Sequence, residues 1–228
     1  MSENDAGIKK LSGPMVKANS GKAKKLVVLL HGYGSDGNDM ISLSQFWAGI
    51  LPDAMFVAPN APDACAINPM GYQWFELDTS STLDLEKNIS RLNGSKAARP
   101  NIEHFLQSLW RETGLSARDT ILIGFSQGAM MALEVGLALE EELKGIVAFS
   151  GGLPDPKNMA GKIKSKPPIC FVHGGNDDVV PVGMSVVSSE ELKKLGLDVR
   201  LHISPTATHT IAQDGLEFAT NFIKEIIA

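Results

Sequence analysis

The sequence predicts an α/β fold with a mostly parallel central sheet that is covered by helices on both faces. Two observations lead to this prediction. Short apolar runs recur along the 228 residues, and each run is bounded by turn-forming residues. Helical stretches separate most of these runs, and a strand–helix–strand alternation is typical of parallel strands joined by crossover helices.

The apolar runs are predicted to be strands that are buried on both faces, because they are continuous rather than alternating in polarity. In chain order they are LVVLLH from Leu26, AMFVAP from Ala54, TILIGF from Thr120, GIVAFS from Gly145, ICFVHG from Ile169 and VRLHIS from Val199.

Capping residues, prolines and glycines mark the predicted helices. Asn38 or Asp39 is the expected N-cap of the first helix, and the second should start just after Pro100 and stop at Gly114. The third should start directly after Ser126. The predicted ranges are 39–50, 101–112, 127–141, 185–194 and 212–227.

The stretch 61–99 is polar and rich in Gly, Asn and Ser, so a long excursion with one helix near 83–92 is expected there. No internal repeat and no Pro/Gly linker divides the chain. We therefore predict a single domain over residues 1–228, in which residues 1–24 form a flexible or loosely packed N-terminal segment.

Composition and charge exclude several classes of protein. With a net charge of −5, the chain lacks the excess of basic residues that attracts nucleic acid or an anionic membrane. No apolar run has the length of a membrane span, and the N-terminus has no apolar core of a secretory signal, so we expect a cytoplasmic protein without a membrane anchor. The histidines and the two cysteines show no metal-ligand spacing, so no metal and no other cofactor is predicted.

The sharpest local signal is Gly-Phe-Ser-Gln-Gly at positions 124–128. It is a GxSxG pattern between a predicted strand and a predicted helix, which is the context of a nucleophile elbow. Gly124 and Gly128 would allow the tight turn that lifts the Ser126 hydroxyl above the sheet. The structural alternative is a serine N-cap between two packing glycines.

A serine hydroxyl needs a base to take its proton, and in hydrolases of this architecture the order along the chain is Ser, acid, His. His202 lies inside an apolar run and is predicted to be a packed strand residue. His173 ends a strand and is predicted to support the neighbouring loop. His209 lies in a small polar loop between the last strand and the last helix, so it is the candidate base.

The orienting carboxylate should follow the preceding strand, where Asp177 and Asp178 are both candidates. An oxyanion hole needs two backbone N–H groups. One candidate is that of Gln127, directly after the serine. The other is that of Tyr33, in the glycine-rich loop that follows the first strand.

The motifs HGYGSDG, GFSQGA, HGGNDDVVP and the late THT loop together resemble the phospholipase/carboxylesterase family of α/β-hydrolases. The stretches APNAP and QWFEL are also similar to family features, and the resemblance covers nearly everything from Leu26 onward. It implies an α/β-hydrolase fold, no cofactor and a Ser-His-Asp triad. The family pattern HGxxDxxVP selects Asp177 over Asp178, and the family often self-associates, which is compatible with a homodimer.

Two departures from the pattern favour the general carboxylesterase branch over protein depalmitoylation. Tyr33 stands where the thioesterases usually have leucine, and His209 lies in TATHT rather than in a GMxHS-like setting. The expected function is a serine carboxylesterase that acts on short- to medium-chain esters, a class of small-molecule substrate. The alternatives are an acyl-thioesterase or lysophospholipase with the same triad, or a non-catalytic ligand-binding module on this scaffold.

The residues that contact the acyl group are less sharply indicated. A substrate cleft is mostly apolar, and several apolar side chains lie in or beside the loops expected around the serine. Besides Tyr33, these candidates are Met70, Trp74, Leu153 and Val180.

Overall fold

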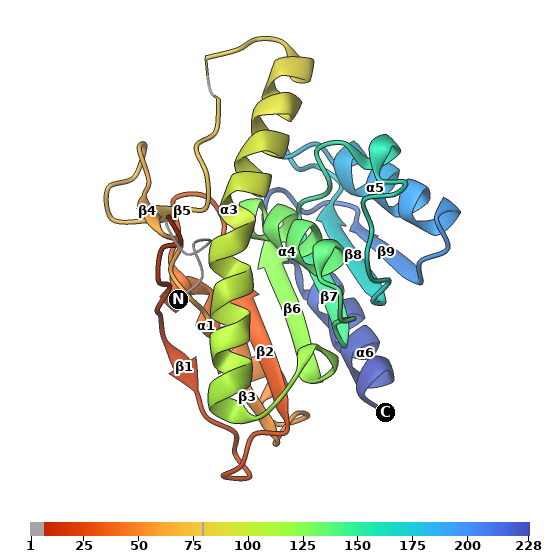
Figure 1. Cartoon of the computed structure of the whole chain (residues 1–228). Coiled ribbons are helices and arrows are strands. Elements are labelled where there is room, and N and C mark those ends of the chain that lie inside the picture. Colours follow the sequence, from red (N-terminus) through yellow and green to blue (C-terminus); the bar gives the residue numbers. More distant parts are fainter. Residues whose placement is uncertain (1–6, 79) are drawn as a thin grey trace.

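The computed structural model describes residues 7–78 and 80–228, and its centre is a seven-stranded sheet (Figure 1). The strand order is β1-β3-β2-β6-β7-β8-β9, and all neighbours are parallel except β1, which pairs antiparallel with β3. The strands are β1 Met15–Val16, β2 Lys25–Leu30, β3 Ala54–Val57, β6 Thr120–Phe125, β7 Gly145–Phe149, β8 Ile169–Gly174 and β9 Val199–Ser204. Each predicted apolar run is therefore confirmed as a strand.

Helices cover both faces of this sheet, as predicted. In β2, Leu26, Val28 and Leu30 pack in one apolar cluster with residues of α3, α4 and α5, whereas Val27 and Leu29 pack in the other cluster. This second cluster includes residues of α1, α2 and α6. The helices are α1 Gly37–Ile41, α2 Ser44–Trp47, α3 Asp84–Thr113, α4 Gln127–Ala138, α5 Gly183–Lys194 and α6 Gln213–Ile227. Burial on alternate sides explains why the strand sequences are continuously apolar.

The first predicted helix differs from the structure. The helix expected over 39–50 is instead two short helices, α1 and α2, and the N-cap is Asp36, whose Oδ1 accepts from the N–H groups of Asn38 and Asp39 at 2.7 and 3.1 Å. The Ser42 hydroxyl donates to the Asp39 carbonyl at 2.6 Å. Serine hydroxyls compete in this way with helical hydrogen bonding, which gives a physical reason for the break.

The separate helices expected near 83–92 and after Pro100 are one continuous helix, α3, with Pro100 inside it. Pro100 and Lys96, one turn earlier, are both exposed. The Lys96 carbonyl that loses its helical partner can therefore bind water, which lowers the cost of the proline. The helix ends at Gly114, as predicted, with φ at 72°.

The expectation of a loosely packed segment at 1–24 is wrong for the residues that the structure describes. Within 7–24, β1 pairs with β3, and Leu11 is buried in the core beside α3. Residues 1–6 lie outside the described residues. The excursion 61–83 contains a small two-stranded sheet, β4 Asp63–Ala64 and β5 Tyr72–Gln73. Among residues 7–78 and 80–228, no helix is both long and apolar enough to cross a membrane.

Candidate active site

Ser126 lies on a strained turn between β6 and α4. Its φ of 55° and ψ of −115° are unusual for a residue with a side chain. Close packing enforces the turn: a Cβ atom on Gly124 would lie 2.1 Å from the Gly128 carbonyl oxygen, and one on Gly128 would lie 2.1 Å from the Leu30 oxygen. The two glycines of the GxSxG pattern are therefore required by backbone contacts.

Asp177 and His209 form a hydrogen-bonded pair at the carboxyl edge of the sheet. His209 Nδ1 lies 2.7 Å from Asp177 Oδ2. The loop after β9, which carries His209, packs directly on the loop after β8, which carries Asp177. The Asn176 N–H donates to the Ala207 carbonyl at 2.9 Å, and a Cβ atom on Gly174 would lie 2.3 Å from the Thr208 oxygen.

The Asp177 carboxylate is held in its charged form. Its side chain is fully buried, and burial alone would raise its pKa. The hydrogen bond from His209 and the N–H groups of Val180 and Val179, at 2.8 and 2.9 Å from Oδ1, outweigh burial and lower the pKa of Asp177. The neighbouring Asp178 is exposed to solvent, as expected for the residue that is not paired.

Ser126 and His209 line the same cavity, which has a volume of about 460 Å³. The His209 ring packs against the ring of Phe125, with 4.8 Å between the centroids. Among the described residues, no hydrogen bond joins Ser126 to His209. In hydrolases without substrate, catalytic hydrogen bonds are often long and shorten when substrate binds.

Two backbone N–H groups beside Ser126 are free to bind an oxyanion. The loop after β2 touches the serine, because a Cβ atom on Gly32 would lie 3.4 Å from Ser126 Cβ. Within the described part of the chain, the N–H groups of Tyr33 and Gln127 donate to no protein acceptor. The phenol of Tyr33 is not an acid–base group near neutral pH, since burial and a hydrogen bond with Cys65 raise the pKa of Tyr33 to about 12.

The Gln127 side chain ties the start of α4 to the excursion after β5. Its Oε1 accepts from the Trp74 N–H at 2.9 Å, and its Nε2 donates to the Phe75 carbonyl at 2.7 Å. The Trp74 indole donates to the His31 carbonyl at 2.9 Å. Trp74 is therefore a buried residue whose hydrogen bond to His31 stabilises the loop before Tyr33. It does not line the cavity that contains Ser126.

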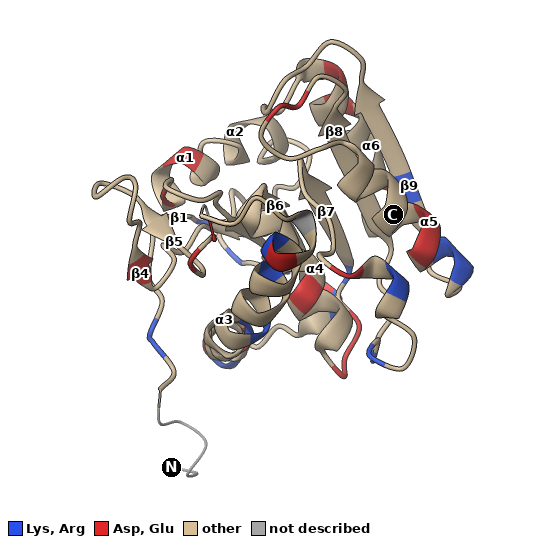
Figure 2. Ribbon diagram, turned by 90° about the horizontal axis from the view of Figure 1, so that it is seen from above, with Lys and Arg blue, Asp and Glu red and all other residues tan. Residues whose placement is uncertain are grey.

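The other predicted acyl-group contacts also lie outside this cavity. Leu153 and Val180 are buried, and Met70 is 86% exposed. Besides Ser126, His209 and Tyr33, the residues that line the cavity are Gly32, Ser35, Asp39, Met40, Leu43, Phe125, Thr210 and Ile211. The start of α1, which supplies Asp39, is one of the acidic segments seen from above (Figure 2). Several of these residues lie inside or directly after the site motifs, but the sequence does not mark which apolar side chains among them face the cavity.

The remaining candidate histidines have other contacts. His173 is buried and contacts Asp177 and Ser185, which agrees with its predicted supporting role. His202 lies in a strand, as predicted, and its ring stacks on that of Phe218 with 5.0 Å between the centroids. It is half-buried on the edge strand β9, and its Nε2 lies 2.8 Å from Asp214 Oδ2.

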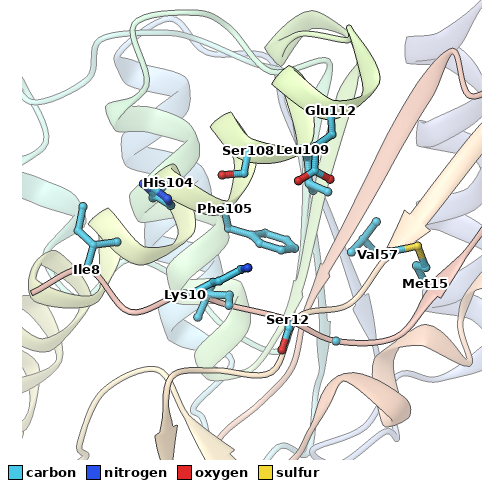
Figure 3. A pocket seen from close by; sticks show the side chains of 12 residues that line it. Ile8, Lys10, Ser12, Met15, Val57, His104, Phe105, Ser108, Leu109 and Glu112 are labelled. Atoms are coloured by element: carbon cyan, nitrogen blue, oxygen red, sulfur yellow. The ribbon is translucent and has the colours of Figure 1, made fainter. Parts of the chain in front are cut away.

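A second cavity of about 560 Å³ lies away from these residues, between the N-terminal segment and α3 (Figure 3). Phe105 and Leu109 of α3 face Lys10 and Met15 across it. Neither Ser126 nor His209 lines it, so it is separate from the cavity beside Ser126.

Comparison with known proteins supports an esterase. The sequence pattern of the family described as phospholipase/carboxylesterase matches residues 11–227. The esterase YpfH of Escherichia coli (strain K12) is 28% identical over 216 residues, which span 93% of this chain and 88% of the esterase. Acyl-protein thioesterase 1 of Saccharomyces cerevisiae is 28% identical over 236 residues, which span 96% of this chain and 100% of the thioesterase.

Solved structures agree with these relatives. The crystal structure of esterase PE8 superimposes with a TM-score of 0.91 at 56% sequence identity, and the match covers 95% of this chain and 99% of that chain. The Bacillus cereus carboxylesterase superimposes with a TM-score of 0.72 at 19% identity, over 99% of this chain and 100% of that chain, which shows the shared fold.

Proposed function

Since the chain belongs to the phospholipase/carboxylesterase family of α/β-hydrolases and is a carboxylic ester hydrolase of the serine type, we propose that it hydrolyses short- to medium-chain esters through Ser126, His209 and Asp177. The observation that carries the proposal is the Asp177–His209 hydrogen bond of 2.7 Å beside the cavity that exposes the strained Ser126.

In the proposed reaction, Ser126 Oγ attacks the ester carbonyl carbon while His209 Nε2 accepts its proton. The Asp177 carboxylate binds the Nδ1–H group, which fixes the tautomer and stabilises the imidazolium that forms. The N–H groups of Tyr33 and Gln127 stabilise the tetrahedral oxyanion. His209 then protonates the leaving alcohol, and water hydrolyses the acyl-enzyme by the same steps.

The volume and the apolar lining of the cavity support a small acyl ester as the substrate. Its volume is about 460 Å³, within the range of small-molecule sites. Apolar side chains for an acyl chain come from Met40, Leu43, Phe125 and Ile211. The second candidate function is acyl-thioester hydrolysis, because the yeast relative is an acyl-protein thioesterase.

A cytoplasmic location and self-association as a homodimer stay predictions.

Replacing the nucleophile tests this proposal. We expect Ser126→Ala to lose roughly 10⁵–10⁶ in kcat on a p-nitrophenyl ester, as is typical when a triad nucleophile is removed. Ser165→Ala is the control, because this serine is also buried but donates to the Gly136 carbonyl. A fluorophosphonate should label Ser126 in the native enzyme and leave Ser126→Ala unlabelled, as mass spectrometry can show. Retention of native turnover by Ser126→Ala would contradict the mechanism.

The same assay decides between the candidate substrates and tests the expected lack of a metal. A series of p-nitrophenyl esters of rising chain length, with acyl-thioesters and lysophospholipids alongside, should give the highest kcat/KM for short to medium acyl esters. A preference for thioesters would favour the second candidate.

EDTA should leave the rate unchanged, because the proposed reaction needs no metal. Inhibition by EDTA that zinc reverses would contradict a reaction carried by the triad alone.

A further inference from the structure

A second imidazole, that of His173, lies against the carboxylate of Asp177. The His173 Nε2 atom lies 3.2 Å from Asp177 Oδ2 and 2.9 Å from the Val180 carbonyl oxygen. The side chains of His173 and Asp177 are both fully buried. The same Val180 donates its N–H to Asp177 Oδ1 at 2.8 Å. His173 and Asp177 therefore hold the backbone C=O and N–H groups of one residue, Val180, in the loop after β8.

The contacts of His173 determine which ring nitrogen carries a hydrogen. The carboxylate and carbonyl oxygens that face Nε2 are both acceptors in this arrangement, so an unprotonated Nε2 would direct its lone pair at two oxygen atoms. Nδ1 faces the Ser185 hydroxyl at 2.6 Å, and a hydroxyl can either donate or accept. Nε2 therefore carries the hydrogen, and the partial positive charge of this group faces Asp177.

His173 also connects Asp177 to the loop after β7, which packs on Ser126. The Ser185 hydroxyl lies 2.7 Å from the Gly151 carbonyl oxygen, and Gly151 packs on the backbone of Ser126, since a Cβ atom there would lie 2.7 Å from the Ser126 oxygen. A chain of buried polar contacts thus runs from the elbow through Ser185 and His173 to Asp177. Distortion at His173 would change the position of His209 relative to Ser126.

We propose that His173 is a positioning residue for the hydrolysis. Its Nε2–H group fixes the Asp177–Val180 turn, and it limits the negative charge that the Asp177 carboxylate presents to His209. This inference rests on the proposed triad. Two titratable groups of the described chain face His173. Besides burial, which lowers the pKa of His173, the Asp177 charge raises this pKa and the His209 charge lowers it. The contacts from α5 and from the turn, Ser185 and Val180, are uncharged.

The test compares His173→Asn with His173→Gln. Asparagine is too short to reach Asp177, whereas the glutamine amide can place an N–H group where Nε2 was. We expect His173→Asn to lower kcat by about 10- to 100-fold with little change in KM, as for loss of a hydrogen bond to a charged group. His173→Gln should stay within about fivefold of the native kcat. His202→Asn removes a histidine of a similar His–Asp pair outside the cavity and should leave kcat unchanged.

The pH–rate profile separates positioning from a merely structural role. Without the Nε2–H group the Asp177 carboxylate would stabilise protonated His209 more strongly, so the midpoint of kcat/KM against pH should move up by roughly half a unit in His173→Asn. A folded His173→Asn enzyme with native kcat and an unmoved midpoint would overturn the inference. So would equal losses in His173→Asn and His173→Gln with an unmoved midpoint.

If His173→Asn does not fold, Ser185→Ala provides the second test. It removes the partner of Nδ1 without changing the imidazole, and we expect a loss of about 3- to 10-fold in kcat. Native kcat in Ser185→Ala would then overturn the inference. Ser126→Ala, assayed alongside, separates failure of the proposed triad from failure of this inference. Native activity in Ser126→Ala would refute the triad. An inactive Ser126→Ala beside a His173→Asn enzyme with native kcat and an unmoved midpoint would refute only the role of His173.

Discussion

At the scale of single residues, Ser126 is held in a conformation that it would not adopt alone. A non-glycine residue at φ 55° and ψ −115° costs on the order of 1–3 kcal/mol. The Ser126 N–H group donates to the Phe149 carbonyl at 2.9 Å, and its own carbonyl accepts from the N–H groups of Ala129 and Met130. These bonds from β7 and α4 hold Ser126 in the strained conformation at the edge of the cavity, which is the position that the proposed nucleophile requires.

The pair Asp177 and Asp178 provides a sharp test at this scale. Asp177→Asn should lose about 10²–10⁴ in kcat, because an amide in that position can present the wrong partner to His209 Nδ1. Asp178→Asn changes an exposed neighbour and should cost less than about tenfold, which makes it the matched control. Both variants are measured on one ester at one pH. A disabled Asp178→Asn beside a near-normal Asp177→Asn would show that the acid is assigned one residue too early.

The sequence could indicate the polar residues of the site but not its apolar wall. Ser126, Asp177 and His209 stand in motifs whose spacing follows from the turns that carry them. Apolar residues carry no such mark, because Leu153 in the core and Leu43 in the cavity have the same chemistry. Which of them faces substrate is decided by packing between distant segments.

At the scale of elements, strands were more predictable than helices. A strand buried on both faces has an apolar sequence of its own, and β2 and β6 show it directly. Helix boundaries depend on small free energies that the tertiary fold can outweigh. In α3, Gly94 packs on Phe75, where a Cβ atom would approach to 2.6 Å, and Pro100 faces solvent. Tertiary packing therefore carries the helix through two residues that are unfavourable in isolation.

The contact between α4 and β2 can be tested by adding one methyl group. A Cβ atom on Gly128 would lie 2.1 Å from the Leu30 oxygen and 2.6 Å from the His31 oxygen, both backbone atoms. We expect Gly128→Ala to lower stability by at least about 2 kcal/mol, hence Tm by roughly 4–8 °C, and to lower kcat because the elbow moves.

Gly183→Ala is the control for this substitution. Gly183 begins α5, and a Cβ atom there would meet nothing within 4 Å. Its Tm should change by less than about 2 °C. A Gly128→Ala enzyme as stable and active as Gly183→Ala would show that α4 can shift away from β2 at no cost.

At the scale of the whole molecule, the active site depends on segments from most of the chain. The parallel order places the carboxyl ends of β2, β6, β8 and β9 at one edge, where their loops supply the proposed oxyanion donor, nucleophile, acid and base. The sequence predicted this because alternation of strands and helices implies parallel strands. It did not predict that β1 would extend the sheet, because two residues, Met15 and Val16, carry no periodic signal.

The same architecture buries two histidines, His31 and His173, and this sets the response of the fold to acid. Burial lowers the pKa of His31 and outweighs the Gly32 carbonyl and the Asp36 and Asp39 charges, which raise it. Burial likewise lowers the pKa of His173 and outweighs the Val180 carbonyl and the Asp177 charge. Below pH about 6.5 the histidines of the unfolded chain take up protons, whereas these two stay neutral in the folded state.

The unfolded state therefore binds more protons, and the free energy of unfolding should fall as the pH falls from about 6.5 toward the folded pKa values. Each buried histidine contributes a slope of up to about 1.4 kcal/mol per pH unit. We expect Tm, followed by circular dichroism from pH 7.5 to 5, to drop over this range.

His31→Gln tests the contribution of one of the two histidines. Glutamine keeps an acceptor for the Ala61 N–H group, which donates to His31 Nε2 at 2.9 Å, but it cannot titrate. The slope of unfolding free energy against pH should therefore be about half that of the native protein. A Tm that stays constant from pH 7.5 to 5 would mean that the folded protein binds protons at both buried sites as readily as the unfolded chain does.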